Sequence, residues 1–216
     1  MAIAPAVRKA EAAGITVVAV DVAAQGASAT VMTDNVKAGA IACQAIADRL
    51  GGKGDVAIVN GPHVSSVIDR VKGCETVLSK AGITPVSDNQ DAKGSRDGGF
   101  AVMQGLLTRF PHIDAVFAIN DPSAIGAGLA ARQLHRTELF ITSVDGAPDI
   151  EAALKDPKSL VAASASQDPY LMAERAVQLG NEIIGGHAPA DTTQLIEPTL
   201  ITAATVGAYH GWSAPR

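Results

Sequence analysis

Short, nearly continuous runs of apolar residues recur along the chain, and longer stretches with a helical spacing of apolar positions separate them. The five runs span residues 15–20, 56–59, 115–119, 139–144 and 160–165. They are rich in β-branched residues and do not alternate with polar ones, which is typical of strands buried on both faces of a parallel sheet.

The stretches between these runs repeat apolar residues every three or four positions, as amphipathic helices do. Four such stripes cover residues 36–50, 67–81, 100–110 and 172–183, and glycine or proline follows each of them. Strands that alternate with helices predict an α/β fold with a doubly wound parallel sheet. Residues 23–30 and 88–95 are expected to be connecting loops.

Composition and charge exclude several classes of protein. The 216 residues include 17 basic and 22 acidic side chains, a formal net charge of −5. Hydrophobic residues make up 47% of the chain, which excludes intrinsic disorder. The acidic balance argues against nucleic-acid binding, which would require a basic stripe. No apolar run reaches the roughly 18 residues of a membrane span, and the first residues lack the pattern of a secretory signal.

The chain contains two cysteines, Cys43 and Cys74, and both lie on the apolar stripes of expected helices. Two cysteines cannot build a disulfide framework, although they could form one bridge. We expect two buried free thiols rather than that bridge.

Polar residues follow the expected strands at the point where each strand ends. These residues are Asp21, Asn60, Asn120, Asp145 and the pair Ser166-Gln167, and none of them is cationic. Ligands bind outside the carboxyl ends of the strands in open parallel sheets. Residues of this type also begin turns, which explains Asn60 before Gly61-Pro62.

Two of these residues stand beside a second acid that can begin the next helix. Asp121-Pro122 and Asp168-Pro169 each place an acid before proline, which suits a helix N-cap followed by the first helical residue. With Asp121 and Asp168 expected to cap the helices, Asn120 and Gln167 remain free to face a ligand.

Asp21, Asn120, Asp145 and Gln167 together offer hydrogen-bond donors and acceptors with little formal charge. This combination suits a neutral polyhydroxyl molecule, because each hydroxyl both donates and accepts. A phosphate would instead require Arg, Lys or a glycine-rich nest.

No motif for catalysis, a metal or a cofactor emerges from the sequence. Residues 126–131 match the dinucleotide fingerprint GxGxxA, whose first glycine belongs in the turn after a strand. Here the helix has already begun at Asp121-Pro122, so Gly126 and Gly128 are expected inside it, for close packing. The five histidines lack metal-ligand spacing, and no nucleophile–base pair is evident. We therefore expect a protein that is not an enzyme and binds no cofactor.

Three segments, residues 120–127, 143–149 and 166–170, resemble the ribose-type periplasmic sugar-binding proteins of ABC importers. Residues 15–21, 33–40 and 70–73 fit the same pattern in the same order. The resemblance implies a type I periplasmic-binding-protein fold, in which two doubly wound lobes close on a sugar about a hinge. It also implies that Asp21, Asn120, Asp145 and Gln167 contact the ligand.

The sequence departs from this family at three positions that contact the sugar. Val22 and Ile68 stand where the family has arginines, and a family aromatic residue falls near Gly94. Arg70 matches a neighbouring arginine with a structural role. The ligand implied is therefore a neutral monosaccharide or polyol, and not ribose in particular.

The resemblance further implies a complete lobe, residues 34–167 with 199–216, and a remnant of the other lobe, residues 1–33 with 168–198. Roughly the first third of the family pattern would be absent, which accounts for a helix at 5–13 that leads directly into a strand. A periplasmic location and the membrane permease of an ABC importer as partner are also implied. Exposed apolar faces on the truncated lobe would favour a homodimer.

Two other functions remain open. The same fold forms the effector-binding domain of lac-repressor-family transcriptional regulators, which require a DNA-binding headpiece upstream. The segment Gln167-Asp168-Pro169 and the low charge favour the transporter protein. The third possibility is an enzyme that acts on a sugar or nucleotide, and a glycosidase assay would detect one such activity.

Overall fold

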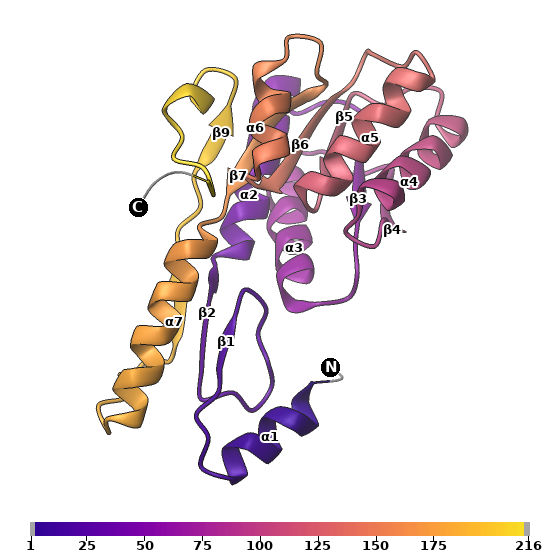
Figure 1. Cartoon of the computed structure of the whole chain (residues 1–216). Helices are drawn as coiled ribbons and strands as arrows, with labels where there is room; N and C mark the ends of the chain where they lie inside the picture. The colour runs from indigo at the N-terminus through magenta and orange to yellow at the C-terminus, as the bar shows by residue number, and fades with distance from the viewer. Residues whose placement is uncertain (1–2, 214–216) are drawn as a thin grey trace. The chain divides into compact units, whose positions relative to one another are not determined.

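The computed structural model describes residues 3–213 and divides the chain into two compact units (Figure 1). The first unit contains residues 3–34, 64–66 and 168–197, and the second contains 35–63, 67–167 and 198–213. Each unit has its own sheet with helices packed against it, so the predicted α/β class is confirmed.

The second unit is built on a six-stranded sheet in the order β4-β3-β5-β6-β7-β9. Its strands are β3 (Val56–Asn60), β4 (Ser87–Asp91), β5 (Ala115–Ala118), β6 (Phe140–Asp145), β7 (Val161–Ser166) and β9 (Leu200–Thr202). The first five strands are parallel, and β9 pairs with β7 in the antiparallel direction. The helices are α2 (Asn35–Leu50), α3 (Ser65–Lys80), α4 (Arg96–Arg109), α5 (Asp121–Gln133) and α6 (Pro148–Lys155), followed by a short 3-10 helix, η1 (Val206–Ala208).

Helices cover both faces of this sheet, because successive side chains of a strand point to opposite faces. Ala57 and Val59 of β3 belong to the core shared with α4, α5 and α6. Val56 and Ile58 belong to the core shared with α2 and α3. Burial on both faces explains why the strands are continuous apolar runs, and the runs at 56–59, 115–119, 139–144 and 160–165 coincide with β3, β5, β6 and β7 to within a residue or so.

The first unit has a smaller, parallel sheet in the order β1-β2-β8. Its elements are α1 (Ala4–Ala12), β1 (Val18–Val20), β2 (Ala29–Thr33), α7 (Pro169–Ile184) and β8 (Thr193–Ile196). Its core joins Ala29 and Val31 of β2 to Met172, Ala176 and Leu179 of α7. The predicted helix at 5–13 is α1, whereas the strand expected at 15–20 begins only at Val18.

Two strands fall partly in segments that the sequence predicts as loops. β4 reads SDNQD and buries only Ser87, so pairing with β3 at the edge of the sheet makes it a strand without any hydrophobic pattern. In β2 the buried residues Ala29, Val31 and Thr33 alternate with half-buried ones. This alternation differs from the continuous runs that mark the other parallel strands.

α2 and α3 are joined by a disulfide between Cys43 and Cys74, so the expectation of two free thiols is wrong. The helices approach closely at two glycines: a Cβ atom on Gly39 would lie 1.9 Å from the carbonyl oxygen of Arg70. One on Gly73 would lie equally close to the carbonyl oxygen of Val36, 1.9 Å away. This contact brings the two cysteine Cα atoms to 5.0 Å, a separation that a disulfide spans.

Glycines also permit close contact between α4 and α5, which lie side by side (Figure 1). A Cβ atom on Gly126 would lie 1.9 Å from the carbonyl oxygen of Arg96, and one on Gly99 would lie 2.2 Å from that of Ser123. The prediction that Gly126 serves helix packing is therefore confirmed, whereas a Cβ atom on Gly128 would make only ordinary contacts. Gly126 and Gly128 both lie inside α5, away from any strand–helix turn.

We expect reduction of the disulfide to lower the free energy of unfolding by about 3–4 kcal/mol, the entropy of closing a loop of this length. The bridge spans a sequence separation of 31 residues. Urea unfolding of the wild-type chain with and without a thiol reductant measures this difference. The double variant Cys43→Ser, Cys74→Ser should unfold at one denaturant concentration under both conditions. An unchanged wild-type midpoint in reductant would contradict the prediction.

Candidate functional site

The predicted site residues come from two places in the fold. Asp145 ends β6, Gln167 directly follows β7, and Asn120 lies two residues beyond β5. Because β5, β6 and β7 are adjacent and parallel, their carboxyl ends lie at one edge of the second unit. Asp21 directly follows β1 and belongs to the first unit.

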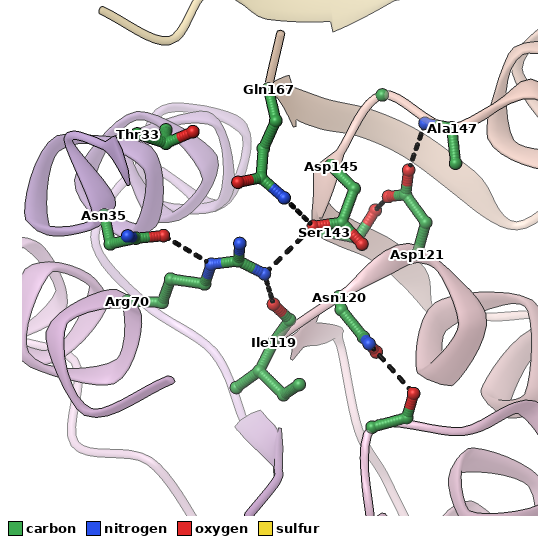
Figure 2. A network of polar contacts seen from close by, with 12 residues as sticks. Thr33, Asn35, Arg70, Ile119, Asn120, Asp121, Ser143, Asp145, Ala147 and Gln167 are labelled. Carbon is green, nitrogen blue, oxygen red and sulfur yellow. Dashed lines mark hydrogen bonds and ion pairs between the residues drawn. The ribbon is translucent and has the colours of Figure 1, made fainter. Parts of the chain in front are cut away.

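Asp145 is the centre of a buried polar network at this edge (Figure 2). Its Oδ1 accepts hydrogen bonds from Arg70 Nη1 at 3.0 Å and from Gln167 Nε2 at 2.7 Å. Arg70 also donates from Nη1 to the carbonyl oxygen of Ile119 at 2.8 Å and from Nε to Asn35 Oδ1 at 2.9 Å. Two predicted residues, Asp145 and Gln167, are therefore in direct contact, and Arg70 holds the carboxylate in place.

Asn120, and not Asp121, caps α5, so the predicted division of roles between them is wrong. The Asn120 side chain accepts the Ser123 N–H at 3.1 Å and donates from Nδ2 to the carbonyl oxygen of Gly94 at 2.9 Å. The helix begins one residue earlier than expected, which makes Asn120 the cap and Asp121 the first helical residue. The cap uses the side-chain oxygen of Asn120, and one of its two amide N–H groups donates to Gly94. The second N–H group can donate a further hydrogen bond.

The other two capping and turn assignments are confirmed. Asp168 caps α7, because its Oδ1 accepts the Leu171 N–H at 2.9 Å. Asn60 shapes the turn after β3, where its Oδ1 accepts the Gly61 N–H at 2.8 Å.

Asp121 is instead a buried acid, only 1% exposed, that ties three segments together. Its Oδ1 accepts hydrogen bonds from the hydroxyls of Ser143 in β6 and Ser164 in β7, at 2.6 and 2.7 Å. Its Oδ2 accepts the Ala147 N–H at 2.8 Å, in the loop that follows Asp145 (Figure 2). The two serines interrupt apolar strands, and that interruption is the sequence signal for this acid.

The two buried carboxyl groups differ in their charged neighbours. Burial, aided by the negative charge of Asp145, raises the pKa of Asp121 to about 7. Burial also raises the pKa of Asp145, and the Arg70 guanidinium opposes that rise. Near neutral pH, Asp145 is therefore the carboxylate that pairs with Arg70, while Asp121 is the group that takes up a proton.

Two of the four predicted residues have an unusual backbone conformation. Asp21 has a φ of 70° and Asp145 a φ of 142°, a region that residues other than glycine rarely adopt. Such strain persists where surrounding contacts hold it, and it clusters at functional sites. Lys93 and His135 also have positive φ, and neither is among the predicted site residues.

The edge of the second unit thus presents a paired carboxylate and two amides, which can bind hydroxyl groups. Ile68, which stands where the resemblance places an arginine, is 42% exposed. It lines a pocket of about 260 Å³ together with Asn60 and His63. Among residues 3–213, no three His, Cys, Asp or Glu side chains gather as a metal site would require. Within the same residues, no helix has the length and apolarity needed to cross a membrane.

Comparison with known proteins places residues 1–188 in the periplasmic binding protein domain family. The ribose import binding protein RbsB of Bacillus subtilis is 37% identical over 188 residues, which cover 86% of this chain and 60% of that protein. A xylitol-binding protein of Mycolicibacterium smegmatis is 37% identical over 155 residues, covering 70% of this chain and 44% of the relative. The chain therefore spans 60% or less of these two relatives.

Solved structures of binding proteins superpose closely on this chain. A galactofuranose binding protein has a TM-score of 0.87 at 25% identity, covering 95% of this chain and 73% of its own. An ABC transporter periplasmic solute binding protein from Actinobacillus succinogenes 130z, with bound D-allose, has a TM-score of 0.87 at 26% identity. The match covers 97% of this chain and 76% of that protein. The predicted type I periplasmic-binding-protein fold is thus confirmed.

The raised pKa of Asp121 predicts a stability that falls as the pH rises. Because this pKa is about 7 in the folded chain and 3.8 for an ordinary aspartate, the folded state binds the proton more tightly. Between about pH 4 and pH 7, the wild-type chain should therefore lose stability relative to Asp121→Asn, which cannot titrate. Urea unfolding at a series of pH values measures the difference.

Asp114→Asn is a control of opposite sign. A hydrogen bond from the Asp55 backbone lowers the pKa of Asp114, so the wild-type chain should gain stability relative to this variant as the pH rises through the acidic range. Parallel pH curves for the wild type and Asp121→Asn would contradict the assignment of the buried proton to Asp121.

Proposed function

Since the chain belongs to the periplasmic binding protein domain family, we propose that it is the binding component of a sugar ABC importer and takes a neutral monosaccharide or polyol. The observation that carries the proposal is Asp145, held by Arg70 and Gln167 at the carboxyl edge of a parallel sheet. Because Arg70 compensates the charge of Asp145, this edge favours neutral hydroxyls over a cation or an anion.

Each site residue has a role suited to its chemistry. Asp145 accepts hydrogen bonds from ligand hydroxyls, and Asn120 and Gln167 each donate and accept. We assign Asp21, at the end of β1 in the first unit, the role of a further acceptor. That a single ligand is held between two lobes remains a prediction. The proteins named above include binding proteins for ribose and xylitol and one with bound D-allose, and all three ligands are polyhydroxyl molecules.

The disulfide supports an exported location, because disulfides persist in oxidising compartments such as the bacterial periplasm. We therefore propose that the protein works in the periplasm, delivers its ligand to a membrane permease and catalyses no reaction. The matched proteins named above are import or binding proteins, which does not favour the effector domain of a transcriptional regulator.

A thermal-shift titration against monosaccharides and polyols tests the ligand class. We expect one stereoisomer to stabilise the folded chain by about 2.7 kcal/mol at a hundredfold excess over its Kd, since a ligand that binds only the folded state does so. Asp145→Asn and Gln167→Ala should each lower the affinity for that ligand by about 30-fold or more, because a buried ligand hydroxyl loses its hydrogen-bond partner.

Asn60→Ser is the matched control, since Asn60 also stands at a strand end but serves a turn. Its affinity for the ligand should equal that of the wild type. The site assignment fails if Asp145→Asn folds and binds as tightly as the wild type does.

We also propose that two copies associate through the first unit. Val177 and Ile184 are 65% and 73% exposed and lie seven residues apart on α7, so they share one face of the helix. Ile15 and Leu195 of the same unit are exposed as well. The pair of exposed apolar side chains on this face of α7 favours association.

Light scattering should therefore give twice the 21.9 kDa mass of one chain. The double variant Val177→Asp, Ile184→Asp should shift the chain to the monomer, because burying two charges opposes association. Glu182→Gln, an exposed position on the same helix, is the control and should remain dimeric. A wild-type monomer at all concentrations would refute the proposal.

A further inference from the structure

The last described segment of the chain packs behind the backbone of the candidate site. After η1, the hydroxyl of Tyr209 donates a hydrogen bond to the carbonyl oxygen of Gly146 at 3.2 Å. The indole Nε1 of Trp212 donates to the carbonyl oxygens of both Asp145 and Gln167, each at 3.2 Å. The family match ends at residue 188, so these contacts lie outside it.

Two of the three carbonyl groups that accept these bonds, those of Asp145 and Gly146, belong to a turn with positive φ angles. Asp145 has a φ of 142° and Gly146 a φ of 72°. The carbonyl oxygen of Asp145 also accepts the Gln167 N–H at 2.8 Å, and the Gly146 N–H donates to the hydroxyl of Ser164 at 3.3 Å. A backbone conformation of this kind persists only when neighbouring groups hold it.

Packing restrains the same turn. A Cβ atom on Gly146 would lie 2.4 Å from the hydroxyl oxygen of Tyr209. Tyr209 therefore contacts the turn on the side where any other residue would carry a side chain. The segment 206–212 and the turn 145–146 thus fit together closely.

We propose that Trp212 is a positioning residue of the ligand site, which fixes the ends of β6 and β7 so that the side chains of Asp145 and Gln167 meet. Its single N–H is shared by the carbonyl groups of these two residues, and therefore couples one strand end to the other. The direction of each side chain follows from its backbone. The consequence for ligand affinity rests on the proposed function, whereas the restraint on the turn does not.

Two variants remove the hydrogen bonds and keep an aromatic side chain at each position. Trp212→Phe lacks the indole N–H, and Tyr209→Phe lacks the hydroxyl. His210→Ala is the matched control, because His210 is an exposed residue of the same segment. The first readout is amide hydrogen exchange in the ligand-free chain, which needs no knowledge of the ligand.

We expect Trp212→Phe to accelerate exchange of the Gly146, Ala147 and Gln167 amides by about tenfold, the size of one lost hydrogen bond. Exchange within β3 and β5 should be unchanged. Tyr209→Phe should also accelerate exchange of the Gly146 and Ala147 amides. His210→Ala should leave the exchange of all these amides unchanged.

The second readout is affinity for the ligand that the titration identifies. Trp212→Phe should bind it about tenfold more weakly and discriminate less between its epimers, because misplaced donors and acceptors lose selectivity. A merely structural role would lower the melting temperature without changing this discrimination.

Trp212 is also the one tryptophan in the sequence, so tryptophan emission reports on this contact directly. At a ligand concentration that saturates only the wild type, the wild-type emission should change and that of Asp145→Asn should not. If the wild type binds the ligand and its tryptophan emission does not change, the coupling between Trp212 and the ligand site is contradicted.

The outcomes separate the two proposals. If no sugar or polyol binds the wild type, the proposed function fails, and the exchange experiment still decides whether Trp212 fixes the turn. The positioning role is overturned if Trp212→Phe leaves turn exchange and epimer discrimination unchanged. It is equally overturned if exchange rises throughout the second unit, because Trp212 would then only stabilise the fold.

Discussion

A buried ion pair between Arg70 and Asp145 is the interaction around which the candidate ligand site of the second unit is arranged. Arg70 lies on α3 and reaches Asn35 at the start of α2, the carbonyl oxygen of Ile119 after β5, and the carboxylate that ends β6. A buried charge costs several kcal/mol unless it is paired and hydrogen-bonded. These contacts meet that requirement and at the same time join α3 to the start of α2 and to the ends of β5 and β6.

A second buried carboxyl group beside a single guanidinium raises the question of where the negative charge resides. Asp145 faces the cation, whereas Asp121 meets hydroxyl and amide groups, so burial acts on Asp121 with less compensation. Ser143 and Ser164 link Asp121 to β6 and β7, the two strands that lead into Asp145 and Gln167. Asp121 and the two serines thus join the strands that carry Asp145 and Gln167, while Arg70 pairs with the charge of Asp145 itself.

The fold and part of the site follow from the sequence, for physical reasons that differ by residue. Strands buried on both faces leave continuous apolar runs, and the residues that end them include Asp145 and Gln167. The roles of Asn120 and Asp121 were exchanged because the helix start moved by one residue, which redirects both side chains. β4 has no hydrophobic period to detect, and the Cys43–Cys74 bridge depends on a helix separation that spacing along the chain does not reveal.

The glycine contact between α2 and α3 has a genetic consequence. A Cβ atom on Gly39 would meet the backbone of Arg70, whose side chain carries the ion pair, so a larger residue there displaces the guanidinium and with it the carboxylate. If the chain serves the uptake proposed above, a selection for cells that no longer take up the ligand would recover substitutions at Gly39 together with those at Asp145. A map of such mutations would therefore extend along the interface of α2 and α3, which contains none of the four predicted site residues.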